Sequence, residues 1–259
     1  SMASIISGLG GSITKQGIGV QSLGAVNTYT GGTTINGGTL ALTVAGSIAA
    51  SSGVTMSSAE SNDIPIFDIS GISAISTIIG DLVDMIGESK VALGLKNLIF
   101  GTNADQTFAG LIQDAGMTPG TGGSITKQGS GVQTLTAIQS YTGITNIQAG
   151  TLALTSTASI ASSAGVQLSA GGGFDITGGN QTIKDLSGTG GFVNLGTSKL
   201  TFGTANSTTY RGTFQGSSNP SNPSASLTKQ GSGTVTLTTA SPLYSGQSLI
   251  NAGGITLQH

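Results

Sequence analysis

The chain has 259 residues with 44 glycines, no cysteine, 7% charged residues, 4% aromatic residues and a formal net charge of −2. Average soluble proteins carry roughly a quarter charged residues and about 7% glycine, so this is not the composition of an ordinary globular enzyme. The lack of cysteine excludes disulfides and thiolate chemistry, and the scattered basic residues exclude a nucleic-acid-binding patch.

Short β-strands are predicted from the first residues onward, because small apolar clusters alternate with serine and threonine. Glycine follows almost every cluster and supplies the turn positions that need a positive φ. Similar apolar positions recur at Ile13, Ile35, Val54, Ile78 and Leu98, about every 22 residues. This spacing is typical of one rung of a β-solenoid, which predicts an all-β fold of roughly 11–12 rungs.

The apolar stretch in the middle of the first 100 residues allows two interpretations. A spacing of three and four residues suits one face of a helix and involves Ile72, Ile75, Ile79, Leu82 and Ile86. The other interpretation, which we favour, is an elaborated rung in which residues 77–79 form a strand.

An internal repeat organises the whole chain. Residues 11–57 and 123–169 align without a gap at an offset of 112 residues, and a shorter third copy covers 226–257. The second halves of the first two copies also match, although the first has five extra residues between Ile69 and Val91. We therefore expect one continuous solenoid over residues 1–259, with units at about 11–122, 123–225 and 226–259 and an elaborated rung at about 58–90.

Several long motifs resemble the passenger-associated repeat of bacterial autotransporters. They are LTKQGSGTVTL (227–237), NTYTGGTTINGGTLAL (27–42), FDIS (67–70), LIFGT (98–102) and TFAGLI (107–112). The resemblance implies a single right-handed parallel β-helix that is exposed on the bacterial cell surface or secreted, after export through a C-terminal outer-membrane β-barrel. Neither a signal peptide nor a barrel is visible, so we interpret the chain as a passenger fragment. We expect this fragment to be a monomer whose cut ends tend to associate, because they expose apolar rungs and strand edges.

Residues that could carry catalysis are few. The single histidine is His259, the last residue, so a serine–histidine triad is not expected. Asp68 recurs as Asp175 and Asp81 recurs as Asp185, which indicates turn or strand-end caps rather than a catalytic pair.

Two further repeated residues have a structural interpretation and an alternative. Lysines of the T-K-Q-G motif are expected to donate to turn carbonyls or to blunt a strand edge: Lys15, Lys127 and Lys229. Tyrosines of the Y-[TS]-G motif are expected to stack beside turns, with a glycan-stacking ladder as the alternative: Tyr29, Tyr141 and Tyr244. Arg211, the only arginine, is expected to be an exposed side chain.

Acidic residues concentrate in the first unit. Eight of the ten acids lie between Glu60 and Asp114 against two lysines, which gives −6, while the rest of the chain is +4. Loops that depart from a regular scaffold often carry contacts. A partner-contact loop is therefore predicted at Glu60, Asp63, Asp81, Asp84 and Glu88. The stretch Ser217 to Ser224 is a second such loop.

These observations favour a non-catalytic passenger that acts as an adhesin, an interaction scaffold or a structural stalk. Its expected partners are proteins or glycans of host or neighbouring cells, and no nucleic acid, cofactor, metal or catalytic residue is expected. The alternative is a polysaccharide-binding or polysaccharide-cleaving β-helix protein, which the shortage of histidine and arginine disfavours.

Overall fold

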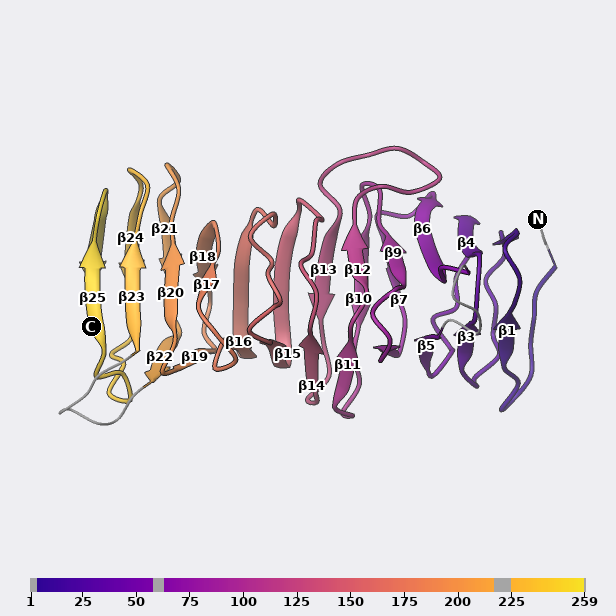
Figure 1. Cartoon of the computed structure of the whole chain (residues 1–259), viewed down its shortest axis with the longest axis horizontal. Coiled ribbons are helices and arrows are strands. Elements are labelled where there is room, and N and C mark those ends of the chain that lie inside the picture. The colour runs from indigo at the N-terminus through magenta and orange to yellow at the C-terminus, as the bar shows by residue number, and fades with distance from the viewer. Residues whose placement is uncertain (1–3, 58–62, 217–224, 259) are drawn as a thin grey trace.

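The computed structural model describes residues 4–57, 63–216 and 225–258. In these ranges the chain forms 26 parallel-pairing β-strands without a helix, stacked as a β-solenoid of about 11 turns (Figure 1). The predicted all-β parallel solenoid is confirmed. Within the same ranges no helix is long and apolar enough to cross a membrane. Glu60 and the stretch from Ser217 to Ser224 lie outside the described residues.

Strands at the same place in successive turns pair with one another and form three ladders along the axis. Ladder I contains β1 (Ile13–Lys15), β3 (Thr33–Ile35), β5 (Gly53–Met56), β8 (Asp81–Asp84), β11 (Gln106–Phe108), β14 (Val132–Leu135), the second halves of β15 (Ile144–Leu154) and β16 (Gly165–Asp175), β19 (Phe192–Gly196) and β22 (Thr213–Gly216).

Ladder II contains β7 (Ser76–Ile78), β10 (Asn97–Phe100), β13 (Ser124–Lys127), the first halves of β15 and β16, β18 (Asp185–Gly188), β21 (Thr208–Tyr210), β24 (Thr234–Leu237) and β26 (Gly254–Leu257). Ladder III contains β2 (Val20–Leu23), β4 (Thr39–Val44), β6 (Ile66–Ile72), β9 (Lys90–Ala92) and β12 (Leu111–Gln113), and later β17 (Gln181–Thr182), β20 (Lys199–Phe202), β23 (Ser226–Lys229) and β25 (Gln247–Ile250).

The core is a set of apolar stacks that run along the axis. In ladder III, for example, Leu40 pairs with Phe67, Phe67 with Val91 and Val91 with Ile112, and all four side chains are fully buried. Burial stabilises by about 25 cal/mol per Å² of apolar area, so such stacks support the fold although aromatic residues are scarce. Some side chains between the core positions are exposed to solvent, for example Thr55 between the buried Val54 and Met56.

The sequence repeat is not a whole number of turns. Following ladder I from β1 through five turns leads to β14, and not to β13, the strand that repeats the sequence of β1. One unit therefore spans about four and two-thirds turns, where the sequence predicts about five. As a result, the equivalent strands β1, β13 and β23 lie in ladders I, II and III respectively.

The elaborated rung of the first unit contains strand and not helix. Ile75 is 84% exposed and Ile86 is 55% exposed, whereas Ile79 is buried, so the five apolar residues share no face. The helical interpretation is wrong, and the favoured strand is β7. Three of the five extra residues precede Asp81, and β6 continues past a register shift to pair Ile72 with Val44.

Candidate functional site

The repeated carboxylates Asp81 and Asp185 tie neighbouring turns together. Asp81 Oδ1 accepts hydrogen bonds from the backbone nitrogen of Thr102 at 3.1 Å and from its hydroxyl at 2.7 Å. Asp185 accepts the same two bonds from Thr204 at the same distances. The second oxygen of Asp81 accepts from Gln106 Nε2 at 3.1 Å. The prediction that these carboxylates are caps is confirmed, since their acceptor sites are occupied within the fold.

Asp68 anchors the long loop between β12 and β13. Its Oδ1 accepts from the nitrogen and hydroxyl of Ser70 at 2.8 and 2.6 Å, and its Oδ2 accepts from the nitrogen of Met117 at 2.7 Å. The loop thereby reaches back over two turns toward β6 (Figure 1). At Asp175, the equivalent residue, the corresponding oxygen accepts instead from Asn194 Nδ2 at 2.9 Å.

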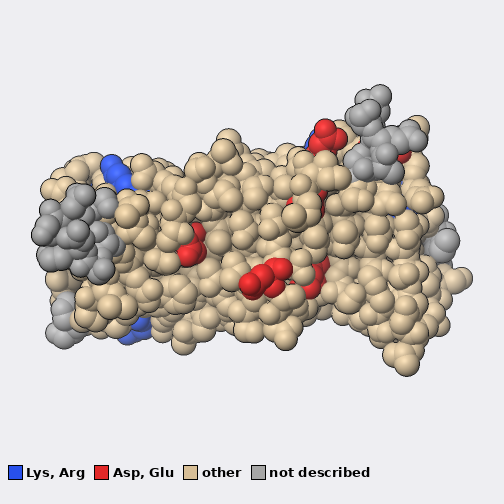
Figure 2. Space-filling model, turned by 60° about the horizontal axis from the view of Figure 1, so that its bottom comes forward, with Lys and Arg blue, Asp and Glu red and all other residues tan. Residues whose placement is uncertain are grey.

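The four described acids of the predicted contact loop do not share one surface. Asp84 is buried and accepts from the backbone nitrogens of Ile86 and Gly87 and from the hydroxyl of Ser89, so its carboxylate closes its own loop. Asp81 is engaged in the tie described above, Asp63 is half-buried against Gly37, and Glu88 is exposed. On the face that Figure 2 shows, acidic groups occupy a few spots and most of the surface is uncharged.

The lysines of the T-K-Q-G motif point inward. Lys15 Nζ donates to the carbonyls of the two residues that follow it, at 2.8 and 2.5 Å, and to the carbonyl of Gly37 on the next turn at 2.9 Å. Lys127 and Lys229 repeat this arrangement, and their exposed fractions are 1% and 0%. The expected donation to turn carbonyls is confirmed, and each ammonium also links two successive turns.

Among the described residues, the hydrogen bonds of these lysine ammonium groups go to backbone carbonyls and not to carboxylates. Burial lowers the pKa of Lys127, and the more distant carboxylates of Asp81 and Asp105 partly oppose that shift. Three carbonyl dipoles therefore replace the usual counter-ion. This arrangement explains a lysine in a core position, because an ammonium can donate three hydrogen bonds.

The repeated tyrosines lie beside turns, as expected, but on different sides of the solenoid. The hydroxyls of Tyr29 and Tyr141 each bond, at 2.6 Å, the hydroxyl of the threonine four residues later. Both rings are buried, while Tyr244 is half-buried and its ring centroid lies 6.3 Å from that of Phe214. Because equivalent residues of the three units occupy different ladders, these tyrosines do not stack on one another, and a ladder for glycan stacking is not formed. Burial raises the pKa of Tyr141 well above its usual value.

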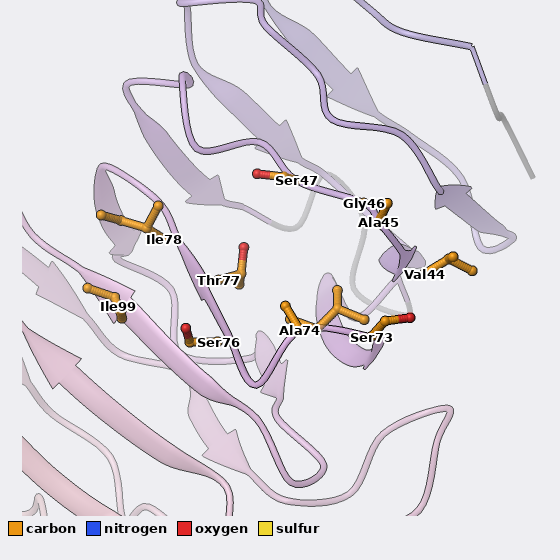
Figure 3. A pocket seen from close by; sticks show the side chains of 11 residues that line it. Val44, Ala45, Gly46, Ser47, Ser73, Ala74, Ser76, Thr77, Ile78 and Ile99 are labelled. Atoms are coloured by element: carbon orange, nitrogen blue, oxygen red, sulfur yellow. The ribbon is translucent and has the colours of Figure 1, made fainter.

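A hollow opens beside β7, the first strand of ladder II. This strand pairs with β10 on one edge, and no described strand pairs with its other edge. The space between β7 and the preceding turn measures about 590 Å³ (Figure 3). Its lining contains no charged side chain and consists of Val44, Ala45, Gly46, Ser47, Ile72, Ser73, Ala74, Ser76, Thr77, Ile78 and Ile99. This hollow was not predicted from the sequence.

Metal-binding clusters are not found in the part of the chain that the structure describes. There, no group of three or more histidine, cysteine, aspartate or glutamate side chains could hold a metal ion. Arg211 is exposed, as expected, and His259 lies outside the described residues.

Comparison with known proteins identifies the repeat. Residues 13–42, 125–154 and 227–258 match the family model described as the passenger-associated-transport-repeat. No curated protein and no solved structure matches the chain. The matched segments begin at or within β1, β13 and β23, the strands that carry the buried lysines.

Proposed function

Because the chain carries three passenger-associated-transport-repeats of autotransporter passengers on a β-solenoid, we propose that it is a non-catalytic structural shaft of such a passenger. Membership in this repeat family implies display on the bacterial cell surface or secretion. On this proposal the shaft holds adhesive or other active parts of the passenger away from the membrane, and contacts with proteins or glycans of other cells are made at sites that depart from the repeat.

The observation that carries the proposal is the rotation of the repeat around the axis. The equivalent strands β1, β13 and β23 fall on three different ladders. A glycan cleft or a flat receptor-binding face built from repeated residues would need those residues on one side. Here the repeat instead preserves inward features, namely the lysines on turn carbonyls and the carboxylate ties between turns.

The carboxylates also support a non-catalytic role against the polysaccharide-cleaving alternative. Glycoside hydrolysis uses two carboxyl groups that face a shared substrate site. Asp68, Asp81 and Asp84 instead each accept two or more hydrogen bonds from neighbouring backbone and hydroxyl groups. These bonds position them as parts of the scaffold.

Deletion of one repeat period tests the shaft. Neighbouring strands are about 4.8 Å apart, so about 11 turns span roughly 50 Å. Removing residues 14–125 joins Ile13 to Thr126 and keeps the repeat sequence continuous. We expect a folded protein that is shorter by roughly 22 Å, or about four and two-thirds turns. Small-angle X-ray scattering measures this length.

The same pair of proteins tests the function. Both are attached to beads with an identical epitope at the distal end, and the reach of that epitope is measured together with binding to cells, glycans and polysaccharides. If the chain acts only as a shaft, the deletion shortens the reach of the epitope and leaves binding to cells, glycans and polysaccharides unchanged. Cell or glycan binding by the intact chain that disappears with the deletion, or turnover of a polysaccharide by either protein, would overturn the proposal.

A further inference from the structure

Carboxamide side chains close gaps in the backbone ladders of this solenoid. Asn27 Oδ1 accepts from the nitrogen of Ile6 at 3.0 Å, while its Nδ2 donates to the carbonyl of Ser47 at 3.1 Å. Gln139 Oε1 accepts from the nitrogen of Ile112 at 2.6 Å, and its Nε2 donates to carbonyls of its own turn and of the preceding turn. Both amides are buried, so each replaces strand–strand hydrogen bonds between adjacent turns.

A third carboxamide closes the gap beside β17. This strand pairs with β20 on one edge only. On the other edge, Gln181 Nε2 donates to the carbonyl of Ala158 at 3.0 Å, and the glutamine side chain is 4% exposed. In the second unit, the side chain of Gln181 therefore fills the space between β17 and the preceding turn.

The equivalent gap in the first unit has no carboxamide side chain to fill it. Thr77 pairs with Leu98 as Gln181 pairs with Leu200, which makes Thr77 the equivalent residue. Gly46 stands 112 residues before Ala158, the partner of the glutamine amide. A threonine is too short to span the gap, and none of the described residues donates to the carbonyl of Gly46. The hollow beside β7 is thus the unfilled counterpart of the Gln181 site.

The rim of this hollow also differs from the second unit. Val44 adopts a φ of 55°, which is costly for a β-branched residue, and its side chain is 64% exposed. Ile78 is partly exposed on the opposite side, and the hydroxyl of Thr77 points across the hollow toward Ser47 (Figure 3). The hollow therefore offers an apolar wall, hydroxyl groups and the carbonyl of Gly46, to which no described residue donates.

We propose that the hollow beside β7 receives the carboxamide of a glutamine or asparagine side chain from a polypeptide other than a second copy of this chain. The amide N–H₂ donates to the carbonyl of Gly46, as Gln181 donates to that of Ala158, and the hydroxyls of Ser47 and Thr77 donate to the amide oxygen. The aliphatic arm packs on Ile78. An ionic ligand is disfavoured because the lining has no charge to compensate it. This contact is independent of the shaft role.

The test uses propionamide, which has the arm and amide of a glutamine side chain. Titration followed by NMR of the backbone amides and isoleucine methyls should show one site with a millimolar Kd, since so few atoms bind weakly. In Thr77→Gln the new glutamine side chain should fill the hollow itself, so the Kd for propionamide should rise at least about tenfold. Thr182→Gln, the same change at an exposed position of β17, should leave binding unchanged.

A reciprocal variant makes the test decisive even if Thr77→Gln does not fold. Gln181→Thr combined with Ala158→Gly opens the counterpart in the second unit, and the number of propionamide sites should rise from one to two. Three results would overturn the proposal. They are no shift at the hollow, binding of N-acetylglucosamine without binding of propionamide, and self-association of the chain that Thr77→Gln abolishes, which would make a second copy the occupant.

Discussion

Replacing a buried lysine of the repeat measures how strongly the inward ammonium groups hold adjacent turns. In Lys127→Met the side chain keeps a similar length, but three carbonyl acceptors lose their donor at 2.7, 2.9 and 3.4 Å. An unsatisfied buried acceptor costs about 1–3 kcal/mol. Part of this cost is offset, because the ammonium no longer has to be removed from water. The expected net loss is about 2–3 kcal/mol.

Urea unfolding followed by circular dichroism provides the measurement, and Lys184→Met provides the control. Lys184 is exposed and donates to a single carbonyl, so its replacement should cost less than about 0.5 kcal/mol. Lys15→Met should cost less than Lys127→Met, since Lys15 is slightly more exposed. If Lys127→Met is neutral or stabilising, as apolar replacement of buried charges sometimes is, the carbonyl cluster does not stabilise the solenoid.

Three further changes have expected outcomes. Burial raises the pKa of Tyr141 and Tyr210, so the folded state keeps protons that the unfolded state loses above about pH 10. Stability should be full below that pH and fall above it, and constant urea midpoints between about pH 9 and pH 11 would contradict this. Val44→Gly relieves a left-handed φ and should be neutral or stabilising by up to about 1 kcal/mol, whereas a thermal shift showing a loss above about 1 kcal/mol would refute strain there. Replacing Ile69–Val91 by Ile176–Val193 should preserve a cooperative unfolding transition and abolish propionamide binding, and any cell or receptor binding that survives the exchange excludes this loop as its contact site.

The sequence was sufficient to predict what depends on local pattern. Alternating apolar residues predicted the strands, glycines predicted the turns, and lysines on turn carbonyls were one of the two interpretations of the T-K-Q-G motif. The rotation of the repeat was not predictable from the average rung of about 22 residues, because individual turns differ. The paired residues Ile13 and Thr33 are 20 positions apart, whereas Gly53 and Asp81 are 28 apart.

The candidate site was harder to predict, because it depends on which residues face each other across turns. Acid content alone suggested a contact loop, yet the turn that follows β8 directs Asp84 inward onto backbone nitrogens. The hollow has a signal in the sequence, which is the replacement of Gln181 by Thr77 and of Ala158 by Gly46. That signal is readable only once the strand register shows that these four residues are equivalent.

One short insertion accounts for the main irregularities of the first unit. The extra residues before Asp81 prolong β6, so that Ile72 reaches Val44 and forms a wall of the hollow. The same strand carries Asp68, which anchors the loop that follows β12 through the nitrogen of Met117. In the second unit, β17 follows the equivalent Asp175 after a shorter connection, with Gln181 in the gap. A regular shaft therefore gains a distinctive surface, while the lysine contacts and the Asp81–Thr102 tie keep the geometry that they have in the second unit.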